Sequence, residues 1–299
     1  MGLVGTYLYF VRTLLGQLLD ADMAAGHLVI WWRIQSGLGA AVYLVSGPVV
    51  IVALAILAGV ALRGGTRRVA FGAVVLVVGS LVTTQLLRTV LDHPYLVDVG
   101  TGLDPTENTL PSGTMAAAYA LALALVLVAP RRAGVRAALV AFMISWLVAV
   151  LLVVASWHDA SDVVAAVFVV TSWAGVALVI AGTTEPDPTA APPDPGRLDI
   201  DRLTRWIVGV GIVVFAAAVT ALLLTAVDIG GRSGLVAQAP WEHLSPRAVL
   251  AGGILLVSGA TCLLFGAFLA VADGNQLGAA HPPPLPRGNE NTEPPSLVP

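Results

Sequence analysis

Long apolar runs separated by short polar stretches dominate the chain. Uncharged runs close to the roughly 20 residues needed to cross a bilayer occupy residues 42–62, 69–87, 137–156, 163–182, 206–227 and 248–272. Residues 114–130 are slightly short and reach full length if residues 111–113 form a first turn. The run at 3–18 is shorter and is interrupted by Arg12. The pattern predicts an all-α polytopic membrane helical bundle, with seven spans and residues 3–18 as a further candidate.

The composition agrees with this class. Of the 299 residues, 57% are hydrophobic and 11% are charged, and the mean hydropathy is +0.88. A soluble core of this length would not use so much apolar surface. The net charge of -3 and the lack of a basic face argue against a nucleic-acid partner. Every basic residue is arginine, a bias typical of a GC-rich bacterium, so a bacterial cytoplasmic membrane is the expected location.

Arginine placement predicts the orientation. Three loops that fall on one side of the bundle carry nine arginines: Arg63, Arg67, Arg68, Arg131, Arg132, Arg136, Arg197, Arg202 and Arg205. By the positive-inside rule this side is cytoplasmic. The opposite loops, at residues 88–113, 156–162 and 228–247, would then be extracytoplasmic.

A Pro- and Asp-rich stretch at residues 183–203 divides the chain and is interpreted as a cytoplasmic linker. It separates a six-helix membrane core at residues 1–182 from a two-helix membrane segment at residues 204–272. Residues 273–299 lack apolar periodicity and are expected to be a disordered cytoplasmic tail. Within the core, residues 23–35 are too short to cross, and their paired tryptophans suit a helix lying in the interface.

Polar residues gather in two of the external loops. Pro111, Ser112 and Gly113 open a helix, so the N–H groups of Gly113 and Thr114 should lack partners and form an anion site. Arg88, just past the end of an apolar run, adds a donor fork suited to phosphate.

The second external loop supplies a candidate nucleophile. His158 and Asp162 are four residues apart, and a helix that begins a turn early would project both from one face. The carboxylate would then hold the imidazole in one tautomer, and an oriented imidazole facing phosphate is a nucleophile or a general base. Together the loops predict a phosphate site at the lipid–water boundary.

These motifs resemble those of the type-2 phosphatidic acid phosphatase family, which shares its core with vanadium haloperoxidases. LRTVLDHP (87–94) is similar to the first family motif, with Arg88 in the Lys place and His93 in the Arg place at a shorter spacing. LPSGT (110–114) matches Pro-Ser-Gly-His except at Thr114. WHDASD (157–162) matches the end of the third motif in His158 and Asp162, whereas Leu151 and Leu152 occupy its Ser-Arg places.

The resemblance implies a role for each residue. His158 would attack phosphorus and form a phosphohistidine, Asp162 would orient it, and Arg88 would neutralise the phosphate. Ser112 and Gly113 would bind phosphate oxygens. Thr114 replaces the histidine that protonates the leaving alcohol, and a threonine hydroxyl is a very poor acid; His93 could bind phosphate or donate that proton instead.

The expected function is a membrane lipid phosphate or diphosphate phosphatase of reduced activity, with polyprenyl (di)phosphate or phosphatidate as substrate and without a cofactor or a metal. The alternative is a catalytically inactive relative that binds lipid phosphates or serves as a structural membrane subunit. A transporter is less favoured, because broken paired helices are not evident. The sequence leaves the headgroup and the oligomeric state open.

Ordinary interpretations exist for each site residue. Arg88 could extend to the interface, His93 could be a plain loop residue, and Pro-Ser-Gly opens many helices. His158 and Asp162 could be a helix-capping pair, and Asp159 and Ser161 are interpreted as cap residues. The order of the motifs along the chain, all of them external, favours the shared site.

Overall fold

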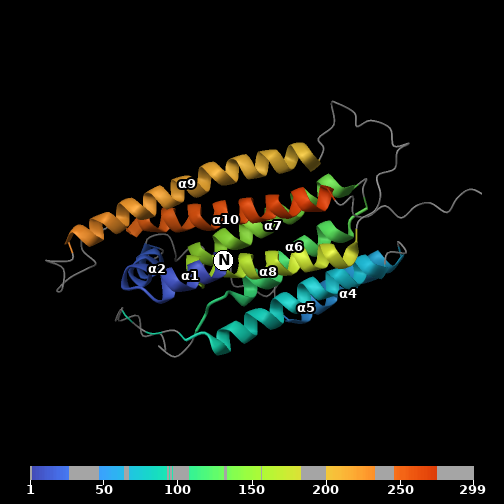
Figure 1. The fold of residues 1–299 in the computed structure, drawn as a ribbon, viewed down its shortest axis with the longest axis horizontal. Coiled ribbons are helices and arrows are strands. Elements are labelled where there is room, and N and C mark those ends of the chain that lie inside the picture. Colours follow the sequence, from blue (N-terminus) through green and yellow to red (C-terminus); the bar gives the residue numbers. More distant parts are fainter. Residues whose placement is uncertain are drawn as a thin grey trace, which may run out of the picture.

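The computed structural model describes residues 2–26, 47–63, 67–92, 94, 96, 108–130, 133–155, 157–182, 200–232 and 246–274. Every regular element in these ranges is a helix, and most of the long helices run side by side along one axis (Figure 1). Five of them are long and apolar enough to cross a membrane. The prediction of an all-α polytopic membrane bundle is confirmed.

Each of the seven expected spans is a helix. These helices are α4 (Gly47–Arg63), α5 (Arg67–Val90), α6 (Gly113–Val128), α7 (Gly134–Val154), α8 (Ala160–Ala181), α9 (Ile200–Arg232) and α10 (Pro246–Gly274). The helices α4 and α6 are shorter than the others. Because α6 begins at Gly113, Pro111 and Ser112 stand before the helix and do not form its first turn.

The apolar run at residues 3–18 is not a single crossing helix. It contains α1 (Gly2–Thr6), the π-helical turn η1 (Tyr7–Val11) and the start of α2 (Leu14–Gly26). The break falls at Arg12 and Thr13. The Arg12 guanidinium lies 3.7 Å from the Asp92 carboxylate, and the Thr13 hydroxyl accepts a hydrogen bond from the backbone of Gly16. Both interactions favour a turn here. The predicted interfacial helix at 23–35 lies mostly outside the described residues.

The amino-terminal helices contribute to the core at one end of the bundle. Leu19 and Met23 of α2 are fully buried. A Cβ atom added to Gly253 of α10 would lie 2.6 Å from the Met23 sulfur and 3.6 Å from Ala160 of α8. In Figure 1, α1 and α2 (blue) lie at the end of the bundle where α5 ends. The α2 helix is therefore packed between α8 and α10.

The arginine-rich ends of the helices meet at the opposite end. A Cβ atom on Gly182, after α8, would lie 3.8 Å from a guanidinium nitrogen of Arg68 at the start of α5. One on Gly134, at the start of α7, would lie 3.1 Å from Ile200 of α9. The bundle thus has one end rich in arginine and another that carries Arg88, Ser112 and His158.

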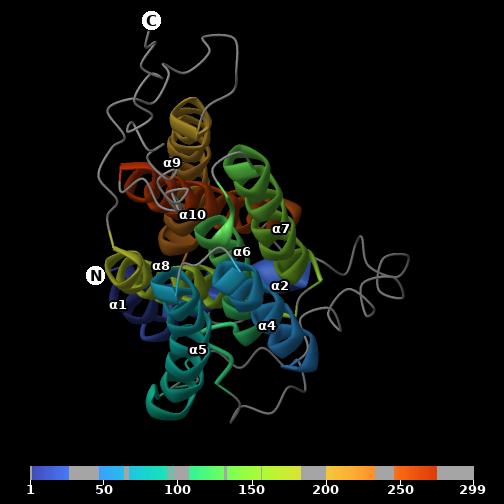
Figure 2. The same ribbon diagram turned by 90° about the vertical axis from the view of Figure 1, so that its right-hand side faces the viewer.

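The carboxy-terminal helices share the core of the preceding ones. Phe265 of α10 is fully buried, and its ring centroid lies 5.5 Å from that of Phe142 of α7 and 6.4 Å from that of Tyr119 of α6. The Trp146 indole donates a 3.0 Å hydrogen bond to the Ser258 hydroxyl. In Figure 2, α10 lies beneath α9, on its inner side. A single hydrophobic core therefore includes α10.

Close backbone contact holds α5 against α8, two of the three helices that contribute residues to the candidate site. A Cβ atom on Gly72 would lie 2.9 Å from the Ala177 carbonyl oxygen. The Trp173 indole donates a 2.9 Å hydrogen bond to the Thr83 hydroxyl across the same contact. Small residues that admit close backbone approach and polar cross-links are the usual means of helix association in lipid.

Substituting Gly72→Ala should weaken this contact, because the new methyl group meets backbone, which cannot rotate away. Overpacking of this kind costs about 1–3 kcal/mol. We expect a lower thermal midpoint for Gly72→Ala in detergent, measured by circular dichroism. Gly175→Ala is the matched control, since a Cβ atom there meets nothing within 4 Å. Equal midpoints for the two variants would contradict the role of this contact.

Candidate functional site

The Pro-Ser-Gly segment forms the entry to α6. Ser112 occupies the N-cap position in an extended conformation, and its hydroxyl accepts a 3.2 Å hydrogen bond from the Met115 N–H. This is the usual stabilising role of serine at a helix start. Ser112 is fully buried, so the cap belongs to the interior of the bundle end. The expectation that this segment opens a helix is confirmed.

A backbone hydrogen bond joins the second and third motifs. The Ser112 N–H donates to the Asp162 carbonyl oxygen at 3.0 Å. The two residues lie in different helical segments, at the start of α6 and in the first turn of α8. The external loops that the sequence predicts to fold together are therefore in direct contact.

Arg88, which belongs to the first motif, connects the end of α5 to the segment before α6. Its Nε donates to the Pro111 carbonyl at 2.9 Å, and its Nη2 donates to the Thr109 carbonyl at 3.0 Å. These bonds hold the segment before α6 against the end of α5. Arg88 is half-buried, and this geometry does not match a side chain that merely extends to the interface.

Asn108 completes the connection between α5 and α6, and no sequence pattern singles it out. Its amide donates to the Leu91 carbonyl at 2.9 Å and to the Arg88 carbonyl at 3.3 Å. Its oxygen accepts from the Leu110 N–H at 3.1 Å. Asn108 therefore satisfies carbonyl groups at the end of α5 that the helix cannot satisfy itself.

Several donors remain for an anion. Within the described part of the chain, the N–H groups of Gly113 and Thr114 have no acceptor, and both residues are partly exposed. The Arg88 Nη1 lies 3.7 Å from the position of a Cβ atom on Gly113. Arginine has five N–H donors, and two of those on Arg88 are used by the loop carbonyls. The start of α6 thus combines two backbone donors with a nearby positive charge, an arrangement that favours anions.

His158 and Asp162 form the expected pair. Nδ1 of the imidazole lies 3.3 Å from Oδ2 of the carboxylate, and the two side chains are 12% and 3% exposed. Since a carboxylate only accepts hydrogen bonds, this contact favours a proton on Nδ1, and in the neutral imidazole that tautomer leaves the lone pair on Nε2. The helix α8 begins at Ala160, so His158 precedes it and Asp162 lies in its first turn.

Two further carboxyl groups, those of Asp20 and Asp159, interact electrostatically with Asp162 of this pair. Burial and the Asp162 carboxylate raise the pKa of Asp159 to about 7. Burial and the Asp159 carboxylate raise the pKa of Asp20, in α2, well above its ordinary value, although hydrogen bonding from Ser161 opposes the shift. Asp20 is 7% exposed, and its Oδ1 has no hydrogen-bond partner. Ionisation of Asp20 and Asp159 is therefore disfavoured at this end of the bundle.

Four further residues carry an interpretation from the sequence: Asp159, Leu152, Thr114 and His93. Asp159 occupies the N-cap position of α8, as its interpretation as a cap residue expects, although its side chain makes no cap hydrogen bond. Leu152, in the place of the family arginine, is buried and supplies no charge. Thr114 is the second residue of α6 and is partly exposed. His93 lies outside the described residues.

The described ranges contain no cluster of three histidine, cysteine, aspartate or glutamate side chains placed to hold a metal ion. A hollow of the described surface lies on α9, toward the other end of the bundle, and does not touch these residues.

Comparison with models of protein families, with curated proteins and with solved structures gives no match. The class of protein is therefore defined by the fold alone, as a multi-pass helical membrane protein.

Replacing Asp159 by Asn should stabilise the protein at alkaline pH. Below pH 3.8, the ordinary pKa of aspartate, the Asp159 carboxyl group is protonated in both the folded and the unfolded protein. Between 3.8 and about 7 only the unfolded state ionises, so stability falls as the pH rises. Above about pH 7 the carboxyl group ionises in the folded protein as well. The whole free-energy cost of the raised pKa then lowers stability, at about 1.4 kcal/mol per pKa unit. We expect a higher thermal midpoint for Asp159→Asn at alkaline pH, with the difference vanishing near pH 4.

Asp201→Asn is the control, because Asp201 is exposed and pairs with Arg205 at the other end of the bundle. An exposed pair of this kind contributes little to stability. The same midpoint for Asp159→Asn and wild type at every pH would show that Asp159 ionises freely in the folded protein.

Proposed function

We propose that this protein is a lipid phosphate or diphosphate hydrolase that works through a phosphohistidine, as its resemblance to type-2 phosphatidic acid phosphatases implies. The observation that carries the proposal is the 3.0 Å hydrogen bond between the Ser112 N–H and the Asp162 carbonyl. It joins the start of α6, where the N–H groups of Gly113 and Thr114 are free, to the first turn of α8, where Asp162 pairs with His158. Neither group alone would support hydrolysis, but a nucleophile beside an anion site does.

In the first step, Nε2 of His158 attacks phosphorus, and the bond from phosphorus to the bridging oxygen breaks, which releases the lipid alcohol from a monophosphate or the lipid monophosphate from a diphosphate. Asp162 stabilises the positive charge that develops on the imidazole, because its carboxylate is 3.3 Å from Nδ1. Charge on the phosphoryl oxygens is met by the N–H groups of Gly113 and Thr114 and by Arg88. Ser112 contributes indirectly: its N–H is committed to Asp162 and its hydroxyl to the cap, so it positions the loop.

The leaving alcohol needs a proton. Thr114 cannot supply it at neutral pH, and general acid catalysis is worth roughly 10²–10⁴-fold. His93 is one proposed donor. Asp159 is a second, because its pKa of about 7 leaves it partly protonated at neutral pH. His93→Ala and Asp159→Asn would each lower turnover only if the replaced residue supplies the proton.

In the second step, water attacks the phosphohistidine, the N–P bond breaks, and inorganic phosphate leaves with His158 restored. The family arginine that would clamp this intermediate is replaced by Leu152, which is buried and apolar. We therefore propose a slower enzyme than a relative with the complete set of cations.

The substrate class follows from the position of the site. The donors lie at the ends of apolar helices, so a phosphate group at the membrane boundary can reach them while its hydrocarbon chain stays in lipid. Polyprenyl (di)phosphate and phosphatidate both fit this description. By the positive-inside rule, the site would face the extracytoplasmic side of a bacterial cytoplasmic membrane.

The second candidate function is binding of lipid phosphates without turnover. Thr114 and Leu152 favour it, since both remove groups that act in the transition state. In that case the anion site at the start of α6 would be retained and His158 would act only as a partner of Asp162. Phosphate release by the wild-type protein distinguishes the two functions.

His158→Ala should reduce phosphate release from phosphatidate or a polyprenyl diphosphate in detergent micelles to the background rate. The reason is that no other group replaces Nε2 as nucleophile in the covalent step. The same variant should also fail to retain labelled phosphate on the protein. Trp157→Phe, at the partly buried neighbouring position, controls for local disturbance. Equal rates for wild type and His158→Ala would eliminate hydrolysis by this site.

Thr114→His should raise turnover, because it restores an acid at the leaving-group position. An increase toward 10²-fold is expected if proton donation limits the wild-type rate. Thr114→Gln is the control of similar size that cannot donate an acidic proton. The comparison uses the rate of phosphate release at saturating substrate. The same rate for the His and Gln variants would refute a missing acid as the limitation.

A further inference from the structure

The α9 helix has one packed face and one open face. A Cβ atom on Gly211 would lie 2.8 Å from that of Cys262 in α10, and one on Gly259 would lie 2.7 Å from the Phe215 backbone. These close approaches define the packed face. On the open face, Trp206 and Val213 are each 69% exposed. Both overall views place α9 at the outer edge of the bundle, with α10 on its inner side (Figures 1 and 2).

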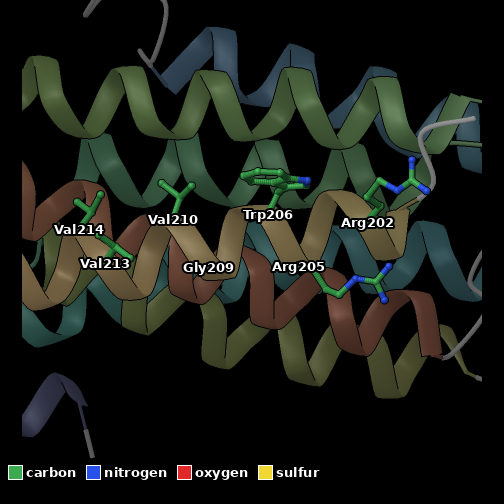
Figure 3. Close-up of a pocket in the computed structure, with 7 residues that line it drawn as sticks. All are labelled: Arg202, Arg205, Trp206, Gly209, Val210, Val213 and Val214. Atoms are coloured by element: carbon green, nitrogen blue, oxygen red, sulfur yellow. The ribbon is translucent and has the colours of Figure 1, made fainter.

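A hollow of about 460 Å³ lies on α9. Figure 3 shows the side chains around it, all from this one helix: Arg202, Arg205, Trp206, Gly209, Val210, Val213 and Val214. A Cβ atom on Gly209 would meet nothing within 4 Å. The missing side chain therefore leaves a gap between Trp206, one turn before it, and Val213, one turn after it.

The lining changes from charged to apolar along the helix. Arg202 and Arg205 lie near its start, at the arginine-rich end of the bundle, and Trp206 follows. Glycine and valine line the part that runs into the membrane span. Arg205 is 2.8 Å from Asp201, but both side chains are about two-thirds exposed, and an exposed pair of this kind is weak enough to be exchanged for another anion.

This order matches the chemistry of an anionic phospholipid. Guanidinium groups bind phosphate through paired N–H donors, and tryptophan is enriched at the level of the headgroups. Basic residues directly beside a span attract anionic lipid. The volume lies within the range of about 300–1,000 Å³ found for small-molecule sites, enough for part of one lipid molecule.

We propose that the hollow on α9 binds one anionic phospholipid of the leaflet at the arginine-rich end, with its phosphate at Arg202 and Arg205 and an acyl chain along Gly209 to Val214. The site lies on a different helix from the hydrolase proposed above and at the opposite end of the bundle. It does not depend on that function, and its test does not measure turnover.

The test uses the full chain in phosphatidylcholine vesicles with a trace of spin-labelled phosphatidylglycerol or spin-labelled phosphatidylcholine. Electron paramagnetic resonance gives the fraction of each label that the protein restricts. The wild type should restrict phosphatidylglycerol several-fold more strongly than phosphatidylcholine. Arg202→Gln/Arg205→Gln should abolish most of that preference. Gly209→Leu should lower it with both arginines present, because the leucine fills the gap.

Arg63→Gln/Arg67→Gln is the matched control, with the same loss of charge at the same end of the bundle but on α4 and α5. It should keep the preference. An equal loss in this control would show attraction by overall charge and would overturn the site, as would full preference in Arg202→Gln/Arg205→Gln. Disulfide dimers of Gly209→Cys in the membrane would also overturn it, because a second copy would then cover the hollow.

Discussion

The hydrogen bond from the Ser112 N–H to the Asp162 carbonyl is the interaction on which this end of the bundle depends. Loops at membrane depth must satisfy their backbone groups within the protein, because lipid offers no partners. Here the start of α6 and the first turn of α8 satisfy one another. The same bond joins the residue before Gly113 to the residue that pairs with His158, so the fold and the proposed chemistry share one constraint.

Arg88 serves the fold and the proposed site together. Two of its donors hold carbonyl groups of the segment before α6, and Nη1 is directed toward Gly113. A guanidinium held in this way needs little reorganisation when an anion arrives, which is the condition for electrostatic stabilisation of a transition state. Lysine in this place would offer a point charge without the fixed fork.

The sequence predicted the helices well and their contacts only in part. Apolar runs indicate helices that avoid water, so a helix lies in each of the seven expected runs, and five of these helices are long and apolar enough to cross a membrane. The pairing of His158 with Asp162 is predicted by helical spacing, and the two side chains do pair, although His158 lies before α8 and not on its face. Asp20 and Asn108 could not be assigned in this way, since the partners of Asp20 lie about 140 residues away and Asn108 acts through backbone groups. The break after η1 falls at Arg12 and Thr13, where the Thr13 hydroxyl accepts a hydrogen bond from the Gly16 N–H, a local contact that apolar periodicity does not reveal.

The placement of α10 changes what counts as the smallest folding unit. Phe265 lies against Tyr119 and Phe142 in the interior, although it follows the linker that divides the chain in sequence. A shortened protein ending at Gly182 would leave an aromatic-sized void beside α6 and α7 and would uncover Met23. The helices after the linker are therefore built into the same body as the phosphate-binding candidate, and swapping them between proteins would require redesign of that interior.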